Sequence, residues 1–217
     1  MASKRGAPAA APRGPIEGLA ALRKVLFHVT AYQAWPSIEE SGLLAAAQVL
    51  DGDPRLQTTR SQPVEVTLAA GGQVVVRDQR AMARSNMEDH LDGMDLAEWL
   101  DLVNERVFLF ARQRELTTYL GRNRELGGQD VVVFDTARLL AAARGRVEVT
   151  TVNPTGPVPW EHCRCRGRYT FEAIEAFRGD VADIEEVTVF GGIEPVTGLV
   201  TRVMRYHPNG KTEVVVG

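Results

Sequence analysis

Short runs of β-branched and aromatic residues recur along this chain and are typical of β-strands. The runs end near Gly, Pro, Asn or Asp, which favour turns. Two pairs of runs predict hairpins, one across 69–72 with its Gly pair and one across Pro208-Asn209-Gly210. The predicted strands cover 25–30, 64–68, 74–77, 106–110, 131–134, 147–150, 186–190, 199–206 and 212–216.

Apolar residues at helical spacing, with Pro before and Gly after them, predict a smaller set of helices. The clearest begins at Pro36 and is closed by Gly42. The predicted helices cover 16–23, 36–41, 43–50, 94–103, 114–120, 136–143 and 171–177. Because strands outnumber helices and do not alternate regularly with them, we expect an α+β domain spanning 16–217, preceded by a flexible tail over 1–15.

Composition narrows the classes of protein that fit. The 217 residues are 44% hydrophobic and 24% charged, which is typical of a globular chain. The formal net charge of -3 excludes binding of nucleic acid by overall charge, so any such contact must be local. We expect no membrane association and a cytoplasmic location, because no apolar run is long enough for a membrane helix or a signal peptide.

Most of the basic side chains are arginines rather than lysines. Only Lys4, Lys24 and Lys211 are lysines among 25 basic residues, and the arginines that remain suit bidentate contact with phosphate or carboxylate. A GC-rich genome would produce the same bias.

Cys163 and Cys165 form at most one ligand pair, so no metal site is predicted.

Two segments place polar side chains on predicted strands. His28 and Thr30 lie two apart, so their side chains share one face and could hydrogen-bond a ribose or an amide. Glu186 opens an apolar strand, where a carboxylate could stabilise a cation or act as a general base. Taken alone, His28 fits a core histidine better and Glu186 fits an exposed acid better, with Asp183 and Glu185 as rivals for its role.

The order of these segments resembles the DarT family of ADP-ribosyltransferases, which modify DNA bases using NAD. In that family a His-x-Thr strand leads into a Pro-Ser-Ile helix ending in Gly-Leu, as Phe27–Thr30, Pro36–Ile38 and Gly42-Leu43 do here. Glu185–Val189 resembles that family's glutamate strand. Segments 76–79 and 104–108 also resemble an uncharacterised bacterial domain-of-unknown-function family that we regard as related.

This resemblance implies a split, mainly antiparallel β-sheet that binds NAD as a co-substrate in a cleft, with no metal. His28, Thr30 and Tyr32 would hold the nicotinamide ribose, and Glu186 would polarise the ribose hydroxyl and the incoming nucleophile. The diphosphate needs an arginine, and Arg77, Arg106, Arg112 and Arg114 are the alternatives, Arg106 and Arg114 being assigned to the catalytic group. The prediction requires His28, Glu186 and one of these arginines to line one cleft.

The acceptor is predicted less directly. The loop over 153–168 lies where DarT-like enzymes position their acceptor, and its aromatic and basic residues could stack a base and bind a backbone. We assign Trp160, Arg164, Arg166 and Arg168 to this role; a solvated loop is the alternative. Ala34-Trp35 stands where the family has Asn, which weakens any transfer of base specificity.

Three functions therefore compete. The leading hypothesis is transfer of ADP-ribose from NAD to a nucleobase of DNA or RNA, or less favourably to a protein side chain. The second is a non-catalytic module that binds NAD, ADP-ribose or nucleic acid, and the third is phosphotransfer from an RNA 2′-phosphate to NAD. The resemblance also suggests that the protein acts as a toxin, with an antitoxin or an ADP-ribosyl hydrolase as its partner.

Overall fold

The computed structural model describes residues 14–68, 72–83, 87–123, 127–156 and 166–217. The predicted tail over 1–15 therefore lies mostly outside the described residues. The strands in the described part are β1 (Val25–Ala31), β2 (Val64–Thr67), β3 (Gln73–Val76), β4 (Arg106–Phe110), β5 (Gln129–Asp135), β6 (Val147–Thr150), β7 (Glu172–Ala173), β8 (Glu186–Phe190), β9 (Val200–Tyr206) and β10 (Thr212–Val216). Every strand predicted from the apolar runs is present.

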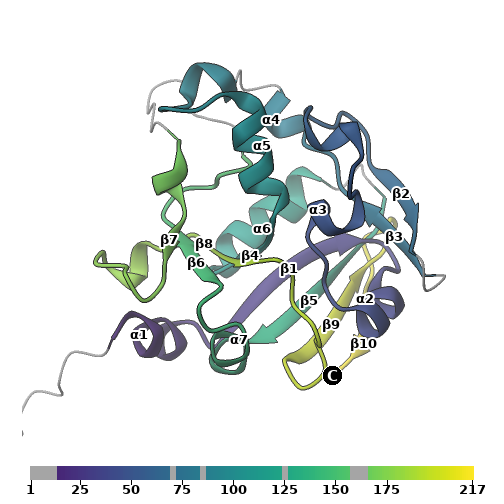
Figure 1. The fold of residues 1–217 in the computed structure, drawn as a ribbon. Helices are drawn as coiled ribbons and strands as arrows, with labels where there is room; N and C mark the ends of the chain where they lie inside the picture. The colour runs from purple at the N-terminus through teal and green to yellow at the C-terminus, as the bar shows by residue number, and fades with distance from the viewer. Residues whose placement is uncertain (1–13, 69–71, 84–86, 124–126, 157–165) are drawn as a thin grey trace, which may run out of the picture.

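Figure 1 shows the helices of the described part of the chain. They are α1 (Pro15–Leu22), α2 (Trp35–Ser41), α3 (Ala46–Val49), α4 (Arg80–Ala83), α5 (Leu96–Asn104), α6 (Gln113–Arg122) and α7 (Thr136–Ala142), with 3₁₀ turns at Pro54–Leu56, Met87–His90, Arg168–Thr170 and Val181–Asp183. A capping box starts α5, because Asp95 accepts from the Glu98 N–H and Glu98 accepts from the Asp95 N–H. The chain thus has the predicted α+β composition.

Glycine is required where α2 ends. Gly42 has φ of 80°, and a Cβ there would lie 2.2 Å from the Glu194 side chain. The close approach brings Leu43 into a β-bridge with Ile193. The chain is therefore extended at Leu43, and the helix predicted over 43–50 is confined to Ala46–Val49.

The helix predicted over 171–177 is wrong. Phe171 stacks on Trp99 in one apolar cluster, whereas Ile174 and Phe177 belong to another. One short helix cannot serve both clusters, so the segment extends and forms β7, which pairs with β6. Burial of the aromatic side chains outweighs the local helical spacing.

Eight strands form one antiparallel sheet in the order β10-β9-β5-β1-β4-β8-β6-β7, and the β2–β3 hairpin lies apart from it. The sheet has two halves of four strands. β1 pairs with β5 along its whole length, and β4 pairs with β8 from Arg106 to Phe110. Between the halves, β1 and β4 share a single register pair, Phe27↔Phe110. The two halves therefore separate between β1 and β4 within one sheet. We call this separation the fork, and it corresponds to the split expected from the resemblance.

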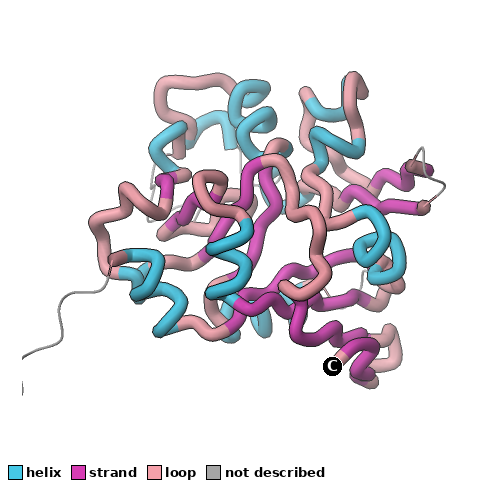
Figure 2. The backbone as a smooth tube through the Cα atoms, turned by 60° about the horizontal axis from the view of Figure 1, so that its bottom comes forward, coloured by secondary structure: helices cyan, strands magenta, loops and turns pink. Residues whose placement is uncertain are grey.

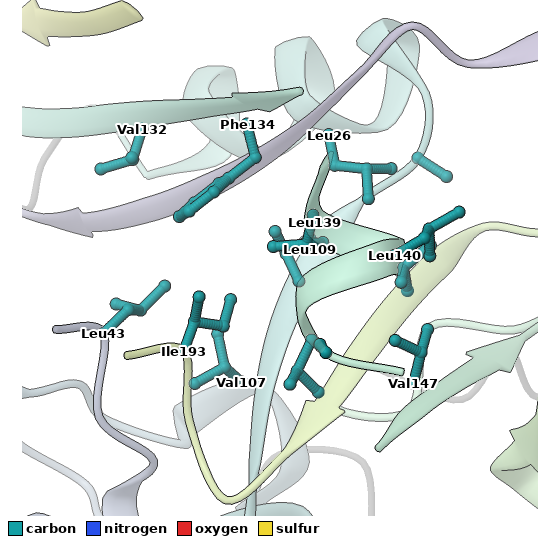
Figure 3. Close-up of a cluster of buried hydrophobic side chains, with 14 of the residues drawn as sticks. Leu26, Leu43, Val107, Leu109, Val132, Phe134, Leu139, Leu140, Val147 and Ile193 are labelled. Atoms are coloured by element: carbon teal, nitrogen blue, oxygen red, sulfur yellow. The ribbon is translucent and has the colours of Figure 1, made fainter. Parts of the chain in front are cut away.

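Both faces of the sheet are covered (Figures 1 and 2). The largest apolar cluster includes residues of α1, α2 and α7 together with one face of the strands. Figure 3 shows part of this cluster, with labelled side chains from β1, β4, β5, β6 and α7. On the other face, Leu116 and Tyr119 of α6 pack with Val29, Val131 and Phe110. The β2–β3 hairpin lies beside α2, and the Ser37 hydroxyl donates to the Gln73 carbonyl. These elements surround the fork between β1 and β4.

Among the described residues, none of the helices has the length and apolar character needed to span a membrane.

Candidate functional site

A cleft of about 1080 Å³ opens at the fork. Its walls come from β1, the end of β3, one side of α6 and the start of β8. The lining includes seven of the residues predicted from the sequence: His28, Thr30, Arg77, Arg106, Arg112, Arg114 and Glu186. Residues separated by up to about 160 positions in the chain therefore meet at one cleft.

The fork explains how His28 and Glu186 come to share a cleft. Strand alternation places His28 on the side of Leu26, whereas Glu186 lies opposite Phe110 and faces α6. In an unbroken sheet these would be opposite faces. Beyond Phe27 the strands separate, and the His28 Nδ1 reaches the Phe108 carbonyl at 2.9 Å across the gap. Both side chains thus line the same opening.

His28 is held in one defined state. A carbonyl oxygen only accepts, so the hydrogen bond to Phe108 requires a proton on Nδ1 and leaves Nε2 as an acceptor. Burial lowers the pKa of His28 to about 4; the Phe108 hydrogen bond opposes this effect and the Arg77 charge adds to it. The imidazole is therefore neutral at pH 7, with Nε2 able to accept from a hydroxyl.

Glu186 is a buried carboxyl of the cleft. It is 3% exposed, and its Oε2 has no hydrogen-bond partner among the described residues. Burial raises its pKa to about 8; neighbouring Glu185 raises it further and Arg166 lowers it. A group kept in this state can take or release a proton near neutral pH, as a general base must.

Arg77 and Tyr119 complete the polar surface near His28. The Arg77 guanidinium lies 5.2 Å from the centre of the Tyr119 ring, and its Nη1 donates to Gln129 at 3.3 Å. Among the described side chains no carboxylate lies within ion-pair distance of it. Burial raises the pKa of Tyr119. The sequence did not identify Tyr119 as a site residue, because its spacing indicates only a helix.

The other predicted arginines are differently engaged. Arg106 forms an ion pair with Glu148 at 2.6 Å and lies over the rings of Phe171 and Phe190, so most of its charge is already matched. Arg112 donates to the Ala182 carbonyl and lies 3.7 Å from Glu115. Arg114 is exposed on the cleft side of α6.

Tyr32, Arg166 and Arg168 are not among the cleft-lining residues. The hydroxyl of Tyr32 bonds His207 at 3.0 Å, and Arg205 lies over the Tyr32 ring. Arg166 is buried and donates to the Asn153 carbonyl, while Arg168 is 70% exposed beside Glu98. Trp160 and Arg164 lie outside the described residues.

A comparison with known protein families gives a match over most of the chain. Residues 24–200 match a family of unknown function, DUF7002. The chain belongs to DUF7002. The DUF7002 region contains both halves of the fork, with His28, Arg77 and Glu186 inside it. No curated protein matches the chain.

Proposed function

We propose that this DUF7002 protein is an NAD-dependent ADP-ribosyltransferase that transfers ADP-ribose to a nucleobase of DNA or RNA. The observation that carries the proposal is the buried carboxyl of Glu186, whose Oε2 has no hydrogen-bond partner among the described residues, in the same cleft as the neutral imidazole of His28. The proposal also draws on the resemblance to DarT-like enzymes described from the sequence. It treats the cleft at the fork as the NAD site.

In this reaction the bond between nicotinamide nitrogen and ribose C1′ breaks, and its electron pair leaves with nicotinamide. Positive charge then develops on the ribose, where the Glu186 carboxylate would stabilise it. A nucleobase nitrogen would attack C1′, and its proton would pass to Glu186 and then to solvent. The products are the ADP-ribosylated base, nicotinamide and one proton, so atoms and charge balance.

His28 would position the ribose rather than exchange protons. Its Nε2 would accept a hydrogen bond from a ribose hydroxyl, because Nδ1 is committed to Phe108. A pKa near 4 keeps the ring neutral over the pH range of the reaction. Arg77, with no carboxylate partner among the described residues, would supply positive charge to the anionic part of NAD.

The test combines nicotinamide release from NAD with detection of ADP-ribose on single-stranded oligonucleotides. Glu186→Gln preserves the size of the side chain and should lower kcat by about 10²–10³-fold or more, as expected for loss of a charge that acts in the transition state. Glu172→Gln, on the exposed strand β7, is the matched control and should leave turnover unchanged. Absence of nicotinamide release and adducts from the wild-type protein would refute the proposal.

Calorimetry separates this activity from the second function. The neutral state of Glu186 at pH 7 also fits a module that binds NAD without cleaving it. Such a module would bind NAD equally well in wild-type protein and in Glu186→Gln, and would release no nicotinamide. Turnover by the wild-type protein that Glu186→Gln abolishes excludes that function.

A further inference from the structure

A buried arginine that the sequence patterns did not single out lies in the same cleft. Arg60 precedes β2 in a turn-rich segment and is 7% exposed. Gln79 and Asn104, also buried, surround it and line the cleft with it. The three come from three different segments of the chain, so only the folded structure reveals the cluster.

The cluster is held together by hydrogen bonds. The backbone of Arg60 exchanges bonds with Gln79, whose N–H donates to the Arg60 carbonyl at 2.7 Å and whose Oε1 accepts from the Arg60 N–H at 3.2 Å. The Asn104 Oδ1 accepts from both the Arg60 Nη2, at 3.0 Å, and the Gln79 Nε2, at 3.1 Å. Neutral groups therefore hold the guanidinium in place, and among the described side chains no carboxylate lies within ion-pair distance of it.

Neutral acceptors use only part of the guanidinium. Nε donates to the Arg77 carbonyl at 3.3 Å, and Nη1 lies 3.5 Å from the Arg55 carbonyl. With the bond to Asn104, these account for three of the five N–H groups that an arginine carries. Within the described part of the chain, two N–H groups are left for a ligand.

The surrounding charges do not neutralise Arg60. Burial lowers the pKa of Arg60 most, and neighbouring Arg55 lowers it further; the carboxylates of Asp53 and Asp78 oppose this effect. Each of these carboxylates is bound to another arginine: Asp53 pairs with Arg55 at 2.5 Å, and Asp78 pairs with Arg80 at 2.8 Å. A buried cation is costly unless an anion compensates it.

We infer that Arg60 forms a subsite in this cleft that binds a phosphate group of a nucleotide ligand. The Arg60 Nε bond to the main-chain carbonyl of Arg77 holds the guanidinium in position, and Arg60 lines the cleft. Guanidinium groups bind phosphate oxygens through paired hydrogen bonds. The identity of the nucleotide rests on the proposed function; the subsite itself rests on burial, geometry and charge.

The first experiment needs no variant. Inorganic pyrophosphate should raise the Tm of the wild-type protein by about 3–5 °C at a tenfold excess over its Kd, relative to NaCl at the same ionic strength. Arg60→Gln should abolish that rise. Arg144→Gln removes one charge from an exposed side chain outside the cleft lining and should keep the rise. No rise in the wild-type protein, or equal losses in both variants, would overturn the inference.

Arg60→Lys covers the case in which Arg60→Gln fails to fold. It keeps the charge but loses the paired donors, so we expect pyrophosphate to bind about 10- to 100-fold more weakly than in the wild type. Wild-type affinity in Arg60→Lys would mean that the fork-shaped guanidinium makes no contact with phosphate, and would overturn the inference.

Two competitors identify the source of the phosphate. Displacement of pyrophosphate by ADP assigns the subsite to the donor diphosphate, and displacement only by an oligonucleotide without terminal phosphates assigns it to the acceptor backbone. Activity is scored separately. Pyrophosphate binding without nicotinamide release would refute the proposed function alone, whereas nicotinamide release with unchanged NAD and oligonucleotide KM in Arg60→Gln would refute the subsite alone.

Discussion

Glu186 should cost this protein stability, and the cost should grow with pH. The folded state raises the pKa of Glu186 to about 8 from 4.5, because the buried carboxyl has no hydrogen-bond partner for Oε2 among the described residues. The protonated form therefore fits the fold best. Its contribution is fully present below pH 4.5 and is lost as pH rises through 8, since the unfolded chain ionises more readily.

The magnitude follows from the two pKa values. Ionisation of this one group should remove about 2–3 kcal/mol of unfolding free energy between pH 5 and pH 7, and about 1 kcal/mol more by pH 9. Glu186→Gln cannot ionise and should escape this loss. The variant should accordingly gain stability relative to wild type as pH rises, even though its activity falls.

Urea unfolding at pH 5, 7 and 9 measures the difference in unfolding free energy between wild type and Glu186→Gln directly, provided that both proteins keep the same m-value. His28, whose pKa the fold lowers to about 4, destabilises both proteins below pH 6.5 and therefore cancels in the comparison. Glu172→Gln is the exposed control and should show no pH-dependent difference. A stability difference between wild type and Glu186→Gln that is the same at all three pH values would refute the reasoning.

Three further predictions concern the cleft and the supports around it. The kcat/KM for nicotinamide release should rise with pH through an apparent pKa near 8, where Glu186 ionises; a flat profile from pH 6 to 9 would contradict this role. Arg106→Met should lower the unfolding free energy by about 2–4 kcal/mol in urea, because it strands the partly buried Glu148; a loss below about 0.5 kcal/mol would show that the pair is dispensable. Gly42→Ala should lower it by more than about 1 kcal/mol, because φ is 80° and the new Cβ would meet Glu194, and a neutral effect would mean that the α2 end relaxes.

The strands could be predicted because their signal is local. Runs such as Val131–Phe134 are apolar throughout, and the structure buries them on both faces in β5. The segment 171–177 could not be predicted, since its outcome depends on Trp99, which lies far away in the chain. Spacing of apolar residues cannot tell one buried face from two separate clusters.

The candidate site also contains some residues that could be predicted from the sequence and others that could not. His28 and Glu186 each sit in a strand with a recognisable pattern, so their place in the fold could be predicted. The choice among arginines could not, because it depends on which of them meets a carboxylate; Arg106 finds Glu148 on another strand. Arg60 lies in a segment without periodicity, and its importance arises only from burial.

The single register pair between β1 and β4 has a consequence for mutagenesis of the cleft. Past Phe27, the described residues of β1 and β4 form no further register pair, so the facing edges of the two strands turn main-chain groups toward the cleft, among them the Phe108 carbonyl that His28 engages. A molecule bound in the fork meets these peptide groups as well as side chains. Because substitutions leave peptide groups in place, alanine scanning of the cleft will account for only part of the binding free energy, and backbone amide-to-ester replacement along β1 is needed to measure the rest.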